Sequence, residues 1–103
     1  MTSDAVDILR RRNRQDPKIE QLIQEEMLNL EVAQLIYDAR QKARLTQAQL
    51  ARRVGTTQSV IARLESADYR GHSLTMLRRI AAALGRGVEI RLTPPVRRAA
   101  PRA

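Results

Sequence analysis

The sequence predicts an all-α domain of about five helices, followed by a single β-strand. Its 103 residues suffice for one small domain with tails. Hydrophobic residues make up 43% of the chain, yet it has no Phe, no Trp and only two Tyr. Short aliphatic side chains of this kind interdigitate between close helices. Apolar residues at helical spacing, with a capping residue before each run, also indicate an all-α domain.

The N-terminal third predicts an arm and two helices. Residues 1–16 are expected to be a mobile arm with a helix-compatible stretch at 4–12. Asp16 can cap a helix over 17–29, since Pro17 at its first position lacks an N–H that a helix start leaves unused. A break at Asn29 then begins a helix over 30–44, although one bent helix over both ranges is the alternative. The apolar stripes are Ile19, Leu22, Ile23 and Met27, then Val32, Leu35, Ile36, Ala39 and Ala43.

The stretch from Leu45 to Glu65 reads LTQAQLARRVGTTQSVIARLE. Thr46 and Gln49 fit a capping box that begins a helix over 47–54. Gly55 stands where a left-handed residue ends that helix, and Thr57 can cap another over 58–65. The short link makes the two helices cross steeply, which is a helix-turn-helix pattern.

One more helix follows a loop at residues 66–72. Ser73 can cap it, it is predicted over 74–84, and Gly85 ends it. Its inner face is expected to hold Leu74, Leu77, Ile80, Ala81 and Leu84.

The segment 86–93 has the period of a half-buried strand, with Val88, Ile90 and Leu92 alternating with charged residues. One strand cannot satisfy its backbone alone, and no other segment of the chain resembles a strand. We therefore expect it to pair with the same strand of a second subunit, which gives a homodimer. Residues 94–103 are a basic, proline-interrupted tail that is expected to be disordered.

The net charge of +8 is unevenly distributed. Residues 1–38 sum to −3, and residues 39–103 sum to +11. A basic domain of this kind favours a polyanion, because DNA releases counterions when its phosphates are neutralised. The alternative is a solubilising arginine surface.

Composition also bounds the chemistry. The chain has no cysteine and a single histidine, His72, so neither a thiolate nor a histidine-rich metal site is expected, and no cofactor is implied. No carboxylate, serine or metal ligand is placed to make His72 catalytic, so we do not expect an enzyme. His72 is instead expected to be a loop residue that lies near the phosphates or has no role. With no apolar run of about 18 residues and no secretion signal, we expect a soluble cytoplasmic protein without membrane contact.

A helical wheel of residues 58–65 separates two faces. Ile61 and Leu64 face the core, whereas the opposite face carries side chains suited to base edges in the major groove, with Ala62 allowing close approach. The predicted base-reading residues are Gln58, Ser59 and Arg63. The predicted phosphate contacts are Gln47, Thr57, Arg44, Arg53 and Arg70.

At these residues the chain resembles the Xre-type helix-turn-helix family, the fold of lambda repressor and Cro. The resemblance covers residues 30–85 and rests on the quoted stretch and on LRRIAAALG. It implies a lambda-repressor-like domain that binds double-stranded operator DNA, with Gln47 on phosphate and the start of the second motif helix on bases. It also implies an ion pair between Arg40 and Glu65.

The wider layout is similar to HigA-type antitoxins, in NLEVAQLIYDARQKARLTQAQLA, YRGHSLTMLRRIAAALG and GVEIRL. This resemblance implies a dimer that represses its own operon and neutralises a small basic, RelE-like ribonuclease toxin. Residues 17–29 would then bind the toxin or extend the dimer. The alternatives are a stand-alone Xre-type regulator without a toxin and a protein-bridging adaptor.

Overall fold

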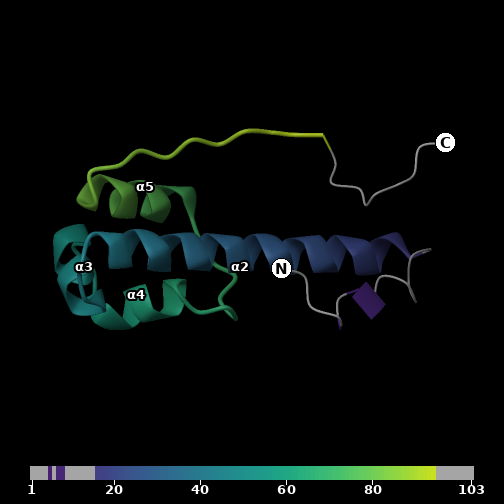
Figure 1. Ribbon diagram of the computed structural model, residues 1–103, viewed down its shortest axis with the longest axis horizontal. Coiled ribbons are helices and arrows are strands. Elements are labelled where there is room, and N and C mark those ends of the chain that lie inside the picture. The colour runs from purple at the N-terminus through teal and green to yellow at the C-terminus, as the bar shows by residue number, and fades with distance from the viewer. Residues whose placement is uncertain (1–4, 6, 9–15, 95–103) are drawn as a thin grey trace.

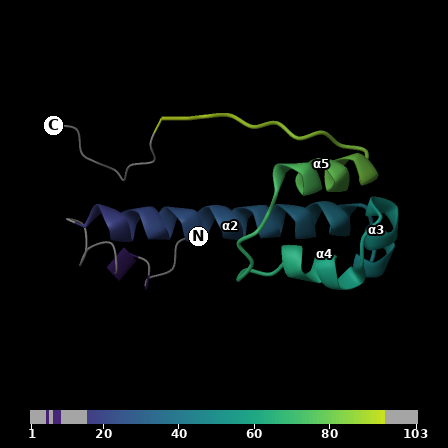
Figure 2. The ribbon, with the colours of Figure 1, turned by 180° about the vertical axis from the view of Figure 1, so that it is seen from behind.

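A computed structural model of the chain describes residues 5, 7–8 and 16–94 (Figure 1). Within this part the four helices are α2 (Pro17–Lys42), α3 (Gln47–Val54), α4 (Gln58–Leu64) and α5 (Leu74–Ala83). Both Figure 1 and Figure 2 show α3 at the C-terminal end of the long α2, with α4 and α5 on opposite sides of it. None of the helices in the described ranges is long and apolar enough to cross a membrane. The expected arm and tail lie almost entirely outside these residues.

Helix α2 is continuous, so the predicted break at Asn29 is wrong. Its start is as predicted: the Asp16 side chain accepts a hydrogen bond from the backbone N–H of Lys18 at 3.0 Å, and Pro17 follows. An asparagine inside a helix costs only about 0.7 kcal/mol, too little to end a run of helix-forming residues. The helix spans 26 residues, or about 39 Å, and ends at Lys42. Its N-terminal half therefore extends beyond α3, α4 and α5 (Figure 1).

The two following helices begin and end through local signals. The Thr46 hydroxyl accepts from the N–H of Gln49 at 3.0 Å, and the Gln49 side chain accepts from the N–H of Thr46 at 2.8 Å. Gly55 ends α3 with φ of 87°, a left-handed conformation that favours glycine. Thr57 caps α4 by accepting from the N–H of Val60 at 3.2 Å. The predicted α3 is thus confirmed, and the predicted α4 is one residue too long.

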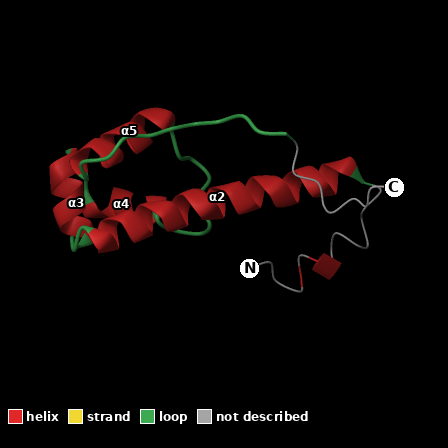
Figure 3. Ribbon diagram, turned by 45° about the horizontal axis from the view of Figure 1, so that its top comes forward, coloured by secondary structure: helices red, strands yellow, loops and turns green. Residues whose placement is uncertain are grey.

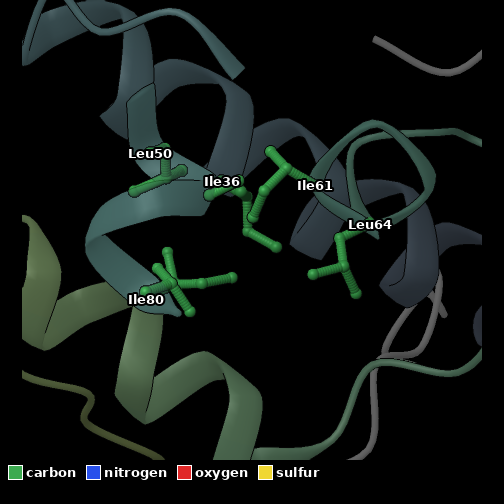
Figure 4. Packing of buried hydrophobic residues seen from close by; sticks show 7 residues of the cluster. Ile36, Leu50, Ile61, Leu64 and Ile80 are labelled. Carbon is green, nitrogen blue, oxygen red and sulfur yellow. The ribbon is translucent and has the colours of Figure 1, made fainter. Parts of the chain in front are cut away.

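The core lies where the four helices meet and consists of aliphatic side chains (Figure 4). Ile36 of α2, Leu50 of α3 and Ile61 of α4 are its largest fully buried members. Four residues expected in apolar stripes or on inner faces are instead exposed: Leu22, Leu35, Ala43 and Leu74. Leu35 lies about 100° around α2 from Ile36, so the core covers one and not the other.

The described residues contain no strand, as the colouring of Figure 3 shows. The expectation of five helices and a strand is therefore corrected to four helices and an extended segment. Val88, Ile90 and Leu92 are exposed in that segment. A strand requires a neighbouring backbone with which to form hydrogen bonds, and the residues that the structure describes offer none to this segment.

Candidate nucleic-acid interface

Helix α4 presents a polar face to solvent while its opposite face is fixed in the core. Gln58, Ser59 and Arg63 are exposed, as the sequence predicted for side chains that would reach outward. Ile61 and Leu64 on the other side are buried. The buried face therefore anchors α4 to the core, and the three polar side chains project from the opposite face of the same short helix.

A chain of hydrogen bonds orients the start of this helix. The Gln58 amide donates to the Oε1 of Gln47 at 2.7 Å. The Gln47 amide in turn donates to the Oε1 of Glu65 at 3.1 Å. Because a glutamine side chain has three rotatable bonds, these contacts reduce the freedom that Gln58 and Gln47 would lose on binding a ligand. Sequence reasoning assigned both residues to the interface but did not find the bonds that join them.

The anchor of this chain is the Arg40–Glu65 ion pair, which the family resemblance implied. Arg40 Nε lies 2.7 Å from Oε2 and Nη2 lies 2.9 Å from Oε1, a bidentate arrangement. Arg40 Nη1 also donates to the carbonyl oxygen of Leu45 at 2.8 Å. The two side chains are 8% and 4% exposed, so water screens the pair weakly. The hydrogen bond to Glu65 raises the pKa of Arg40 above its usual value.

Three of the residues predicted to touch phosphate lie at the surface around α3 and α4. Thr57, Arg53 and Arg44 are all exposed. The Thr57 oxygen already accepts the helix-capping bond, but its O–H remains a donor. Arg44 has φ of 60°, a left-handed conformation that costs a side-chain-bearing residue about 1 kcal/mol or more.

Other polar residues have intramolecular partners that the sequence did not indicate. Arg70, predicted on phosphate, forms an exposed ion pair with Glu26 of α2. His72 donates from Nε2 to the carbonyl oxygen of Leu64 at 2.7 Å and so caps α4. Arg79 of α5 donates to the carbonyl oxygen of Val54 at 2.8 Å, at the end of α3. These partners lie 8 to 44 residues apart in the chain, so no local spacing marks them.

Comparison with known proteins gives one match. A family model described as Helix-turn-helix matches residues 36–90, which is more than half of the chain. The match covers the C-terminal end of α2, the helices α3 to α5 and most of the extended segment. No curated protein and no solved structure matches the chain.

Proposed function

The chain belongs to the helix-turn-helix family, and we propose that it is a transcriptional repressor that reads operator DNA with α4 and acts as an antitoxin. The family membership supports a sequence-specific DNA-binding regulator. The observation that carries the proposal furthest is the outward face of α4. Its exposed amide, hydroxyl and guanidinium suit base edges, and its buried back holds them in fixed positions.

Gln58 is suited to reading adenine. Its amide donates one hydrogen to Gln47 and keeps a second hydrogen and its carbonyl oxygen. Those two groups match adenine N7 and the adenine amino group in the major groove. Arg63 would bind guanine through O6 and N7, and Ser59 would bond to either base.

Backbone contacts would hold the domain in register. The first N–H groups of α3 have no partner within the helix, and Gln47 stands at its first position. Together they would bind one phosphate, with Thr57, Arg44 and Arg53 on neighbouring phosphates. Arg70 would join them only by exchanging Glu26 for DNA.

A two-fold dimer would place two α4 helices in successive major grooves, about 34 Å apart. Segments 86–93 would pair across the axis through their exposed backbones, with Val88, Ile90 and Leu92 on one side of the ribbon. Occupancy of a palindromic operator would then block the promoter. No cofactor is required for this mechanism. A cytoplasmic protein associated with the nucleoid fits such a role.

The antitoxin part of the proposal concerns the projecting half of α2. Glu20, Glu25 and Glu26 lie there, Glu31 follows one turn later, and residues 1–38 sum to −3. This acidic helix would bind a small basic toxin of the RelE-like ribonuclease type. The charge complementarity would speed association and set the orientation of the two proteins.

Two experiments test the proposal. A gel shift with the DNA upstream of the gene, against a shuffled sequence of equal length, should give a shift at least 100-fold tighter for the upstream DNA. Equal affinity for both would reject the repressor. Co-expression with the adjacent reading frame should yield a stable complex of the two proteins. A specific shift without such a complex would instead indicate a stand-alone regulator, and no footprint at all would indicate an adaptor.

A further inference from the structure

The middle of α2 carries an apolar row that a single chain covers only in part. Leu28, Val32, Leu35 and Ala39 follow one another at intervals of four, three and four residues, the spacing of a helix–helix or helix–sheet seam. Leu28 is 61% and Leu35 is 67% exposed, whereas Val32 between them packs partly on the core. The row thus continues from the core onto a surface that a single chain leaves open.

A second apolar row lies on the extended segment. Val88, Ile90 and Leu92 point to one side of an extended backbone, and all three are exposed. Figure 1 and Figure 2 show this segment leaving α5 and running toward the N-terminal end of α2, apart from that helix. The row of α2 is about 16 Å long and the row of the segment about 13 Å, so the two match in length.

The α2 row faces away from the loop that follows α4. Glu26, which meets Arg70 in the loop after α4, is about 160° around the helix from Leu28. Val32, one turn from Leu28, packs on the core cluster, to which all four helices contribute. The leucines therefore point away from the α4 side of the molecule.

Charge also matches the two surfaces. Glu25 and Glu31 lie about 60° to either side of Leu28 on α2. The extended segment carries Arg86 and Arg91, both exposed, and Glu89, whose Oε2 lies 3.2 Å from Arg91 Nε, so that one positive charge is in excess. The apolar row of α2 thus has acidic borders, and the apolar row of the segment has arginines at its ends.

From these observations we propose that a second copy of the chain covers the α2 row. The two 87–92 segments pair as an antiparallel ribbon, and the ribbon lays Val88, Ile90 and Leu92 across the Leu28–Ala39 rows of both α2 helices. This inference rests on the homodimer of the proposed function and adds its second layer. An isolated two-stranded ribbon is marginal in water and becomes stable when it packs against a helix. Packing on α2 would therefore stabilise the ribbon, and the ribbon would cover the exposed leucines of α2.

The test compares two double variants of the same helix in the full chain. Leu28→Glu with Leu35→Glu places charge in the row, whereas the control, Leu22→Glu with Leu30→Glu, alters leucines that are 55% and 48% exposed on other faces. Sedimentation equilibrium without DNA gives the dimer dissociation constant. It should rise about 100-fold or more in the first variant, since four buried leucines are lost per dimer, and stay within about threefold in the control.

A second variant and a second measurement guard against misfolding. Leu28→Ala with Leu35→Ala should weaken the dimer by about tenfold while the helical circular dichroism stays unchanged. Amide hydrogen exchange of residues 87–92 should be slow in the wild-type dimer and fast in both row variants.

Two results would overturn the inference. One is a wild-type chain that remains a monomer at all concentrations tested. The other is a wild-type dimer whose dissociation constant is unchanged by the row variants. Because DNA is absent from these measurements, a failed gel shift would reject the repressor without changing their outcome, and a normal gel shift would not rescue the interface.

Discussion

Replacing Glu65 by glutamine removes one negative charge and keeps the shape of the side chain. In the wild type the carboxylate accepts two bonds from Arg40, at 2.7 and 2.9 Å, and one from Gln47 at 3.1 Å. Glutamine has one oxygen and one NH₂ group in their place, so it can accept only part of this set. The buried guanidinium of Arg40 then keeps its charge and loses its counter-charge.

The expected cost follows from the burial of the pair. Removing one partner of a buried ion pair costs about 3–5 kcal/mol, because the remaining charge stays desolvated. The lower end applies here, since the Leu45 carbonyl and the glutamine oxygen still accept from Arg40. At about 4–8 °C per kcal/mol for a domain of this size, 3 kcal/mol lowers the unfolding midpoint by about 12–24 °C.

Urea unfolding at one fixed protomer concentration measures the loss, because the proposed dimer would make stability depend on concentration. A second variant, Arg40→Met with Glu65→Leu, replaces both charges by apolar groups and should unfold within about 1 kcal/mol of wild type. It should nevertheless bind operator more weakly than wild type, since Gln47 loses the carboxylate that orients it. The double variant would then keep the stability of the wild type and lose part of its affinity for DNA.

A loss below about 1 kcal/mol in Glu65→Gln would show that water reaches the pair and that the burial argument is wrong. Wild-type operator affinity in the double variant would show that the orientation of Gln47 does not matter for binding. Each result refutes a different step of the reasoning.

The remaining predictions concern single positions. Arg63→Ala should cost about 1–3 kcal/mol of binding free energy at one base pair and relax the sequence preference there. Arg53→Ala should weaken binding to all sequences and reduce the slope of log affinity against log salt concentration by about 1. Equal losses of affinity on operator and random DNA for Arg63→Ala would contradict the base-reading role. Arg44→Gly should raise the free energy of unfolding by about 1 kcal/mol, because φ of 60° suits glycine, and should lower affinity for every DNA sequence in filter binding. Gly55→Ala should lower the free energy of unfolding by about 1–2 kcal/mol in urea titration, since φ is 87° there and the added carbon would lie 3.4 Å from Arg79; an unchanged midpoint would show that the turn relaxes without cost.

Local signals predicted both ends of α3 and the start of α4, because the groups involved lie within four residues of each other in the chain. The Thr46–Gln49 capping box, Gly55 at the end of α3 and the Thr57 cap are all of this kind. The outward face of α4 followed from helical periodicity for the same reason. The break at Asn29 was wrong because a weak local preference cannot outweigh a long run of helix-forming residues.

The sequence by itself determined the helical class, the capped turn between α3 and α4, and the exposed position of Gln58, Ser59 and Arg63. Tertiary structure decided that Gln58 bonds to Gln47, that Arg79 caps α3, that Arg70 meets Glu26, and that Leu35 stays exposed. The physical reason is the distance along the chain between the interacting groups. Backbone hydrogen bonds and caps form between near neighbours in the chain, whereas burial and side-chain pairing depend on how separate helices pack in space.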